Sequence, residues 1–396
     1  MLRAVEVTVE RQAELVAKEQ AEARAIVARA VLEERLMVHG GAGIDLRLPS
    51  DMKIYTSETG KPSDYDVFVR GTDDAAIVAV VRPMWKRVRD AGYGTHYPEA
   101  QHAGTRHLFA YPPSAVTVTL RRNYPEVLDV TGVEPAEYDV LCLLAEAEPL
   151  PRGSRPFLVA PTPYLKMCFH LEFSRPRSSV ERWRKLYPRM VVLYRAYPTV
   201  GTAPVAPVAP VAPVARSRPS RGGSSASRSA DRPARELLAA ARRGRWILVG
   251  ERAAALIRGS AVPPDGAEYE FVVADADAAA SEAAGALGAT EPPAAAAEGH
   301  MLPARRTVRG AAATCVLYST VSHEQAHCTA YNTVPSPTAP SGVRRVGSPD
   351  LVLRLLYGRH ILAGGGAHAR AIDALVDHLK TCPNEGLCRR FVCECA

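Results

Sequence analysis

Two similar residue patterns occur in the two halves of this chain of 396 residues. In the first half, the apolar segment 37–40 ends in glycine and precedes the acidic triplet Asp64-Tyr65-Asp66, and in the second half residues 247–250 precede Glu268-Tyr269-Glu270. The glycine lies 24 positions before the first acidic residue in the first pattern and 18 positions before it in the second. The repetition predicts an internal duplication, in a chain long enough for two domains with ordinary hydrophobic cores.

A low-complexity segment separates the two patterns. Residues 201–232 contain the repeated Ala-Pro-Val of residues 203–214, followed by a stretch rich in Ser, Arg and Gly. This composition cannot bury enough apolar surface to fold, so it predicts a linker. We therefore expect a first domain over residues 1–200, which includes the helices that follow the acidic triplet, and a second domain over residues 233–396 with a cysteine-rich tail.

The acidic residues of the first pattern lie inside apolar, strand-like segments. Asp64 and Asp66 are two residues apart, so a strand would place both carboxylates on one face. Asp129 lies in another apolar segment, where a carboxylate is costly to bury unless it binds a metal ion or pairs with a cation. Such carboxylates can hold a pair of divalent cations, and the backbone N–H groups of Gly40 and Gly41 can hold phosphates. The alternatives are a solvated strand end for the first two residues and a buried ion pair for the third.

Basic residues outnumber acidic ones. The 49 Lys and Arg against 42 Asp and Glu give a formal net charge of +7, which favours an anionic partner such as nucleic acid or a nucleotide. Arg182, Lys185 and Arg189 would form a basic stripe on one helix face, provided that Pro188 does not break the helix. The stripe is either a solvated face or a track for RNA or phosphate, because clustered cations release counterions from a polyanion.

The second pattern lacks parts of the predicted site. Glu251 and Arg252 replace the second glycine and its neighbour, and their side chains would fill the space in which a backbone approaches phosphates. No acidic residue occurs in the strand-like residues 314–321, where a third carboxylate would be expected. We therefore expect a degenerate second copy that supports the first domain or helps to hold RNA.

Periodicity and capping residues predict the elements around these motifs. Residues 9–35 carry one apolar helical stripe. Thr72 or Asp73 would cap a helix that ends near Gly92, and Thr162, followed by proline, would begin a helix that ends near residue 173. The predicted strands after the acidic triplet are residues 106–111, 115–120 and 126–131.

Motifs from both halves of the chain combine into one family resemblance. They comprise the double glycine through Pro49, the acidic triplet with Val67-Phe68, residues 165–176 with Arg182-Trp183-Arg184-Lys185, and residues 328–332 and 344–351. Together they resemble the catalytic subunit of the poly(A) polymerases of large DNA viruses, within the nucleotidyltransferase superfamily. The resemblance implies an α+β fold in which a polymerase-beta-like nucleotidyltransferase domain is followed by a second, degenerate copy of the same fold.

The resemblance also implies an activity. This activity is the template-independent addition of AMP from ATP to RNA 3′ ends, which is mRNA polyadenylation, by two-metal phosphoryl transfer with Mg²⁺ or Mn²⁺. Asp64, Asp66 and Asp129 are the expected catalytic metal ligands. The expected nucleotide contacts are Gly40, Gly41 and Lys166, and the expected RNA or phosphate contacts are Arg182, Lys185 and Arg189.

Two residues depart from the family pattern. The family resemblance also does not specify one of the protein partners. Ala42 replaces a small hydroxyl residue and Asp45 replaces a common asparagine, which affects triphosphate contacts more than the reaction class. Besides ATP and an RNA 3′ end, the expected partner is either a second copy of this chain in a homodimer or a separate processivity subunit.

Two other functions remain open from the sequence. His323, Glu324 and His327 match the H-E-x-x-H pattern of zinc metalloproteases, although the strand-like residues on both sides leave little helix to carry the pair. The structural alternative for these residues is a polar loop. The second possibility is a catalytically inactive RNA-binding or scaffold protein.

The expected environment follows from apolar segments and cysteines. No apolar signal core and no stretch long enough to span a bilayer occur, so we expect no membrane association, no secretion and a cytosol-like compartment. The resemblance implies the virion and the host cytoplasm. The eight cysteines then read as thiols, and the four in the tail lack the paired C-x-x-C spacing of ordinary zinc sites.

Overall fold

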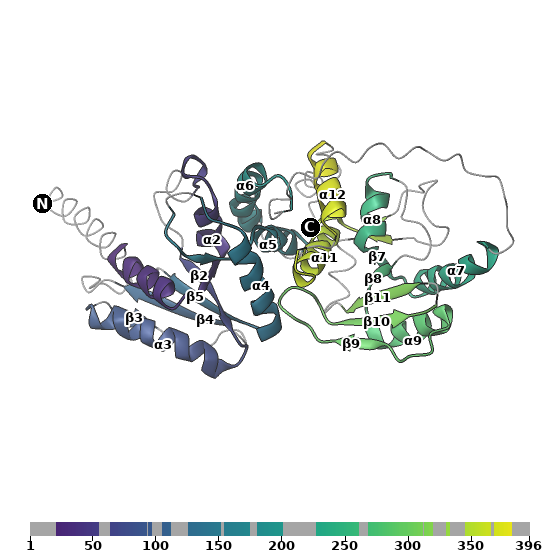
Figure 1. Cartoon of the computed structure of the whole chain (residues 1–396), viewed down its shortest axis with the longest axis horizontal. Coiled ribbons are helices and arrows are strands. Elements are labelled where there is room, and N and C mark those ends of the chain that lie inside the picture. The colour runs from purple at the N-terminus through teal and green to yellow at the C-terminus, as the bar shows by residue number, and fades with distance from the viewer. Residues whose placement is uncertain are drawn as a thin grey trace, which may run out of the picture. The chain divides into compact units, whose positions relative to one another are not determined.

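The chain folds into two compact units with a mixed sheet in each (Figure 1). Unit 1 comprises residues 1–165 and 188–198, and unit 2 comprises residues 166–187 and 199–396. Residues 166–187 therefore group with unit 2, although the sequence analysis assigned them to the first domain. The computed structural model describes residues 21–54, 64–92, 94–96, 105–111, 126–151, 154–174, 180–200, 227–260, 268–311, 313–319, 330–332, 345–365 and 368–381.

Unit 1 contains a six-stranded sheet with the order β3-β4-β5-β2-β1-β6. Its strands are β1 (Met37–His39), β2 (Tyr65–Arg70), β3 (Gly94–His96), β4 (Thr105–Tyr111), β5 (Glu126–Val133) and β6 (Leu158–Val159). Its helices are an N-terminal helix over residues 21–33, α2 (Gly40–Arg47), η1 (Ser50–Met52), α3 (Asp74–Asp90) and α4 (Pro135–Ala147).

Unit 2 contains a seven-stranded sheet with the order β12-β13-β7-β8-β11-β10-β9. Its strands are β7 (Ile247–Val249), β8 (Tyr269–Val273), β9 (Ala294–Ala296), β10 (Arg305–Arg309), β11 (Thr314–Ser319), β12 (Ala330–Asn332) and β13 (Arg345–Gly347). Its helices are α7 (Ser227–Arg243), α8 (Gly250–Ile257), α9 (Ala276–Leu287), α11 (Pro349–Leu362) and α12 (Ala369–Thr381), and the unit boundary falls within α5 (Thr162–Phe173) and α6 (Val180–Ala196).

The two sheets share one topology over six strands. The order β6-β1-β2-β5-β4-β3 in unit 1 corresponds to β13-β7-β8-β11-β10-β9 in unit 2. Every corresponding pair of neighbouring strands runs in the same relative direction, parallel for β2–β5 and β8–β11 and for β1–β6 and β7–β13, and antiparallel for the others. The register also agrees, because His39 lies opposite Asp66 and Val249 lies opposite Glu270.

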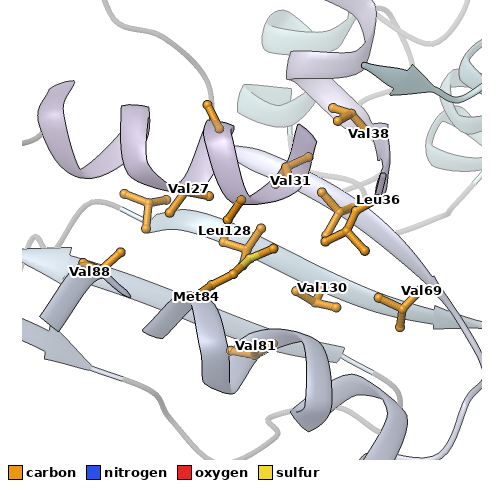
Figure 2. Close-up of a cluster of buried hydrophobic side chains, with 14 of the residues drawn as sticks. Val27, Val31, Leu36, Val38, Val69, Val81, Met84, Val88, Leu128 and Val130 are labelled. Carbon is orange, nitrogen blue, oxygen red and sulfur yellow. The ribbon is translucent and has the colours of Figure 1, made fainter. Parts of the chain in front are cut away.

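The hydrophobic core of unit 1 lies on one face of its sheet (Figure 2). Val27 and Val31 of the N-terminal helix and Met84 of α3 pack there with Val69 of β2 and Val130 of β5, all fully or almost fully buried. Side chains alternate along a strand, so burying Val67 and Val69 of β2 directs their neighbours Asp66 and Phe68 to the opposite face. The core thereby decides which face of the sheet carries the acidic residues.

Several predicted elements are confirmed. Asp73 caps α3, since its carboxylate accepts a hydrogen bond from the Ala76 N–H at 2.7 Å. α5 begins at Thr162 as predicted, α6 continues through Pro188, and the predicted strands 106–111 and 126–131 correspond to β4 and β5.

Other predicted elements lie partly or wholly outside the described residues. α7 begins at Ser227, inside the predicted linker 201–232, whose residues 201–226 lie outside the described part of the chain. The predicted strand 115–120, the first part of the predicted helix 9–35 and the cysteine-rich tail lie outside it as well.

A buried arginine connects α2 to the rest of unit 1. Arg47 has no exposed surface, and its guanidinium donates to the carbonyl oxygens of Glu148 at 2.6 Å, Val159 at 2.7 Å and Ala160 at 3.2 Å. Burial lowers the pKa of Arg47, and the charge of Glu148 raises it. Because Arg47 is the last residue of α2, these bonds hold the C-terminal end of the helix against β6 and the residue that follows α4.

We expect Arg47→Met to destabilise unit 1 by about 2–5 kcal/mol, because it leaves three carbonyl groups without their donor inside the protein. Urea unfolding monitored by circular dichroism would measure the loss. Arg70→Met is the matched control, because Arg70 and its ion-pair partner Asp139 are both more than half exposed. Equal unfolding midpoints for the two variants would contradict the assignment.

Candidate functional site

Helix α2 begins on a glycine that touches a carboxylate. Gly40 has a positive φ of 56°, and a Cβ atom at this position would lie 1.9 Å from Oδ2 of Asp66. The N–H of Gly41 donates to the same oxygen at 3.3 Å. Only glycine leaves room for this carboxylate, and the helix N-terminus stabilises its negative charge. The double glycine therefore positions Asp66, a role that the sequence analysis did not assign to it.

Asp66 and Asp129 are brought together by strand register. They lie directly opposite each other on the parallel strands β2 and β5. Neighbouring strands are about 4.8 Å apart, and directly opposed residues point to the same face. Two carboxylates 63 positions apart in the numbering thus become neighbours. Asp64 immediately precedes β2.

Histidine positions lie opposite both aspartates in the strand register. His39 of β1 lies opposite Asp66, and His107 of β4 lies opposite Asp129. The imidazole of His39 stacks on Phe68, with ring centroids 3.7 Å apart. Neither histidine was among the site residues predicted from the sequence. The sequence signals only that they lie in strand-like segments, and strand pairing is needed to bring their positions opposite the acidic residues.

The predicted metal ligands do not form a ready-made cluster of three. Within the described ranges, no group of three or more His, Cys, Asp and Glu side chains is placed to hold a metal ion. Asp66 and Asp129 are paired by register, whereas Asp64 lies outside the strand. Asp64 is instead close to Arg24 of the N-terminal helix. Burial lowers the pKa of Arg24, and the negative charge of Asp64 raises it.

The predicted nucleotide and RNA contacts have different surroundings. Lys166 is fully buried in unit 2, and its ammonium donates to the Thr199 carbonyl at 2.7 Å. This contact gives Lys166 a structural role in unit 2. Arg182 forms an ion pair with Glu172 at 2.8 Å but is still 59% exposed. Lys185 is exposed on the same helix, and Arg189 follows it as a half-buried residue.

Unit 2 repeats the glycine contact without the third acid. Gly250 has a φ of 71°, and a Cβ atom there would lie 2.0 Å from Oε1 of Glu270. Val316 lies opposite Glu270, where Asp129 lies opposite Asp66 in unit 1. Arg252 is 3% exposed, and its guanidinium lies 4.0 Å from the ring centroid of Tyr269.

One further sequence motif lies outside the described part of the chain. His323, Glu324 and His327 lie outside the described residues, so the metalloprotease interpretation stays a prediction. Among the helices in the described part of the chain, none is both long and apolar enough to cross a membrane.

Comparison with known proteins supports the fold. No protein-family model matches the chain, and no curated protein sequence does. Among solved structures, the chain is similar to the Megavirus polyadenylate synthase, with a TM-score of 0.64, 14% sequence identity and alignment over 97% of this chain and 74% of that one. At this identity the likeness concerns the fold. The chain therefore has a mixed α/β fold similar to that of a viral polyadenylate synthase, which agrees with the family resemblance seen in the sequence.

Proposed function

We propose that this chain is a template-independent polynucleotide adenylyltransferase, a poly(A) polymerase that adds AMP from ATP to RNA 3′ ends. The observation that carries the proposal is the pairing of Asp66 with Asp129, with Gly40 packed against Asp66. The fold likeness to a viral polyadenylate synthase supports this reaction class. mRNA polyadenylation is the process in which we expect the activity.

The residues at this site suit divalent cations. Carboxylate oxygens are the ligands that Mg²⁺ and Mn²⁺ prefer, and Asp66 and Asp129 supply them from adjacent strands. Asp64, Asp66 and Asp129 would hold the ions. When bound, such ions stabilise the attacking and leaving oxygens of an in-line displacement at the α-phosphate of ATP.

The protein positions the reacting groups. The Gly41 N–H donates to the Asp66 carboxylate, which orients this carboxylate against the start of α2. Asp129 would hold the ion nearest the RNA 3′-hydroxyl and so favour loss of the hydroxyl proton. The glycine backbone at Gly40 and Gly41 is also our proposed contact for the triphosphate. The hydrophobic core behind the sheet holds both strands rigidly in register.

Unit 2 fits the role of a degenerate copy of unit 1. The shared topology, the shared register and the repeated glycine contact support a common origin. Val316 in place of an acid and the buried Arg252 argue against catalysis in unit 2. We propose that it supports unit 1 or helps to hold RNA.

The basic stripe on α6 is our proposed RNA contact. Arg182, Lys185 and Arg189 recur at i, i+3 and i+7 on a helix that Pro188 does not interrupt. A net charge of +7 favours the same polyanion. For processive synthesis we propose either self-association or a separate subunit.

We expect the double variant Asp64→Asn/Asp66→Asn, and separately Asp129→Asn, to reduce metal-dependent extension of an RNA oligonucleotide with ATP by at least about 100-fold. Gel analysis of extended RNA with Mg²⁺ or Mn²⁺ would measure it. Asp139→Asn, which alters an exposed carboxylate of the same unit, is the control. Undiminished RNA extension by the double variant would contradict the assignment of Asp64 and Asp66 to the site. A wild-type chain that binds RNA but incorporates no AMP would instead support the inactive scaffold.

We expect Gly40→Ala to reduce extension at least about tenfold, because the new methyl group displaces the Asp66 carboxylate. Because residue 40 has a positive φ, the alanine also adds a backbone cost of about 1–2 kcal/mol to the folded state. Gly92→Ala separates the two effects, since Gly92 also has a positive φ but a Cβ atom there meets nothing within 4 Å. A parallel loss of activity in both variants would show that backbone strain, and not the carboxylate contact, matters.

A further inference from the structure

Unit 2 carries an arginine at its acidic pair. Arg359 of α11 contacts both Glu268 and Glu270 through Nη1, with a distance of 3.0 Å to Oε2 of Glu270. The guanidinium is largely withdrawn from solvent, with 22% side-chain exposure, and Glu270 is 4% exposed. A single guanidinium nitrogen thus bridges the two carboxylates.

These glutamates occupy the positions of the unit 1 aspartates. Glu270 corresponds to Asp66, because each touches the positive-φ glycine that begins the following helix and each lies opposite the last residue of the preceding strand. Glu268, two residues earlier, corresponds to Asp64. The cation that bridges the acidic pair of unit 2 is therefore supplied by the protein itself.

The surroundings of Glu270 are arranged for a permanently charged partner. The Tyr318 hydroxyl donates to Oε2 of Glu270 at 2.8 Å. Burial raises the pKa of Tyr318, and the charge of Glu270 raises it further, so the hydroxyl keeps its proton and remains a donor. Burial lowers the pKa of Arg359, but Glu270 and Glu268 together raise it above its usual range, so the guanidinium stays charged.

We propose that Arg359 takes, in unit 2, the place that a divalent cation takes in unit 1, so that unit 2 binds no divalent cation at Glu268 and Glu270 until this side chain is removed. The comparison with unit 1 rests on the function proposed above. Two carboxylates at one strand end repel each other unless a cation lies between them. An arginine meets this need without metal, and it leaves no open coordination position for a nucleotide.

The first test is stability. Arg359→Met leaves Glu270 buried without its cation, and we expect the thermal unfolding midpoint to fall by roughly 6–15 °C. Arg306→Met is the matched control, because Arg306 pairs with Asp277, which is 76% exposed, and we expect a fall of less than about 2 °C. The triple variant Arg359→Met/Glu268→Gln/Glu270→Gln should recover most of the loss. If Arg359→Met fails to fold while the triple variant folds, the proposal is supported in the same way.

The second test is metal uptake in a chain whose unit 1 site has been removed. In the Asp64→Asn/Asp66→Asn background, titration with MnCl₂ followed by electron paramagnetic resonance should show one more bound Mn²⁺ per chain after Arg359→Met. Adding Glu268→Gln and Glu270→Gln should abolish this uptake. Because burial raises the pKa of Glu270, a proton competes with the ion, and a mildly alkaline buffer favours the metal.

Three results would overturn the proposal. One is an unfolding midpoint for Arg359→Met no lower than that of Arg306→Met. Another is Mn²⁺ bound at Glu268 and Glu270 while Arg359 is present. The third is no gain of bound Mn²⁺ in a folded chain that carries Arg359→Met. None of these measurements uses polymerase activity, so failure of the proposed function, seen as full activity of the unit 1 variants, is distinguishable from failure of this inference.

Discussion

The contact between a glycine and a carboxylate organises both sheets of this protein. In each unit, a strand ends, the chain turns through a glycine with positive φ, and a helix begins against an acidic side chain of the next strand. Gly40 and Asp66 make this contact in unit 1, and Gly250 and Glu270 make it in unit 2. A Cβ atom at either glycine would overlap the carboxylate, so strand, turn, helix and acid depend on one another.

The two faces of the unit 1 sheet carry different side chains, with the hydrophobic core on one face and the acidic pair on the other. The N-terminal helix and α3 bury the valines of β2 and β5 on one face. Asp66 and Asp129 directly precede Val67 and Val130 in these strands, so they lie on the other face and in the same row. In unit 2 the corresponding row contains Glu270 and Val316, and an arginine from α11 neutralises the acid. The same framework thus carries an acidic pair in one unit and an internally neutralised site in the other.

Local signals predicted helices well, because capping and apolar periodicity act over a few residues. Asp73 caps α3 and Thr162 begins α5 as the sequence indicated. Contacts between separate elements cannot be predicted from these local signals. The burial of Lys166 against the Thr199 carbonyl depends on how α5 packs within unit 2, and the bond from Arg182 to Glu172 depends on where α6 lies against α5. Neither partner is recognisable from local residue types.

The amino-acid sequence by itself determined the acidic triplet, the double glycine, the repeated pattern in the second half and the family resemblance, because each is encoded by neighbouring residues. Only the tertiary structure decided that Asp129 lies opposite Asp66, that His39 joins the same row and that Arg359 reaches Glu268 and Glu270. Strand register and helix packing make these contacts between residues far apart in the chain. They minimise the exposed apolar surface of a whole unit, which no short segment specifies.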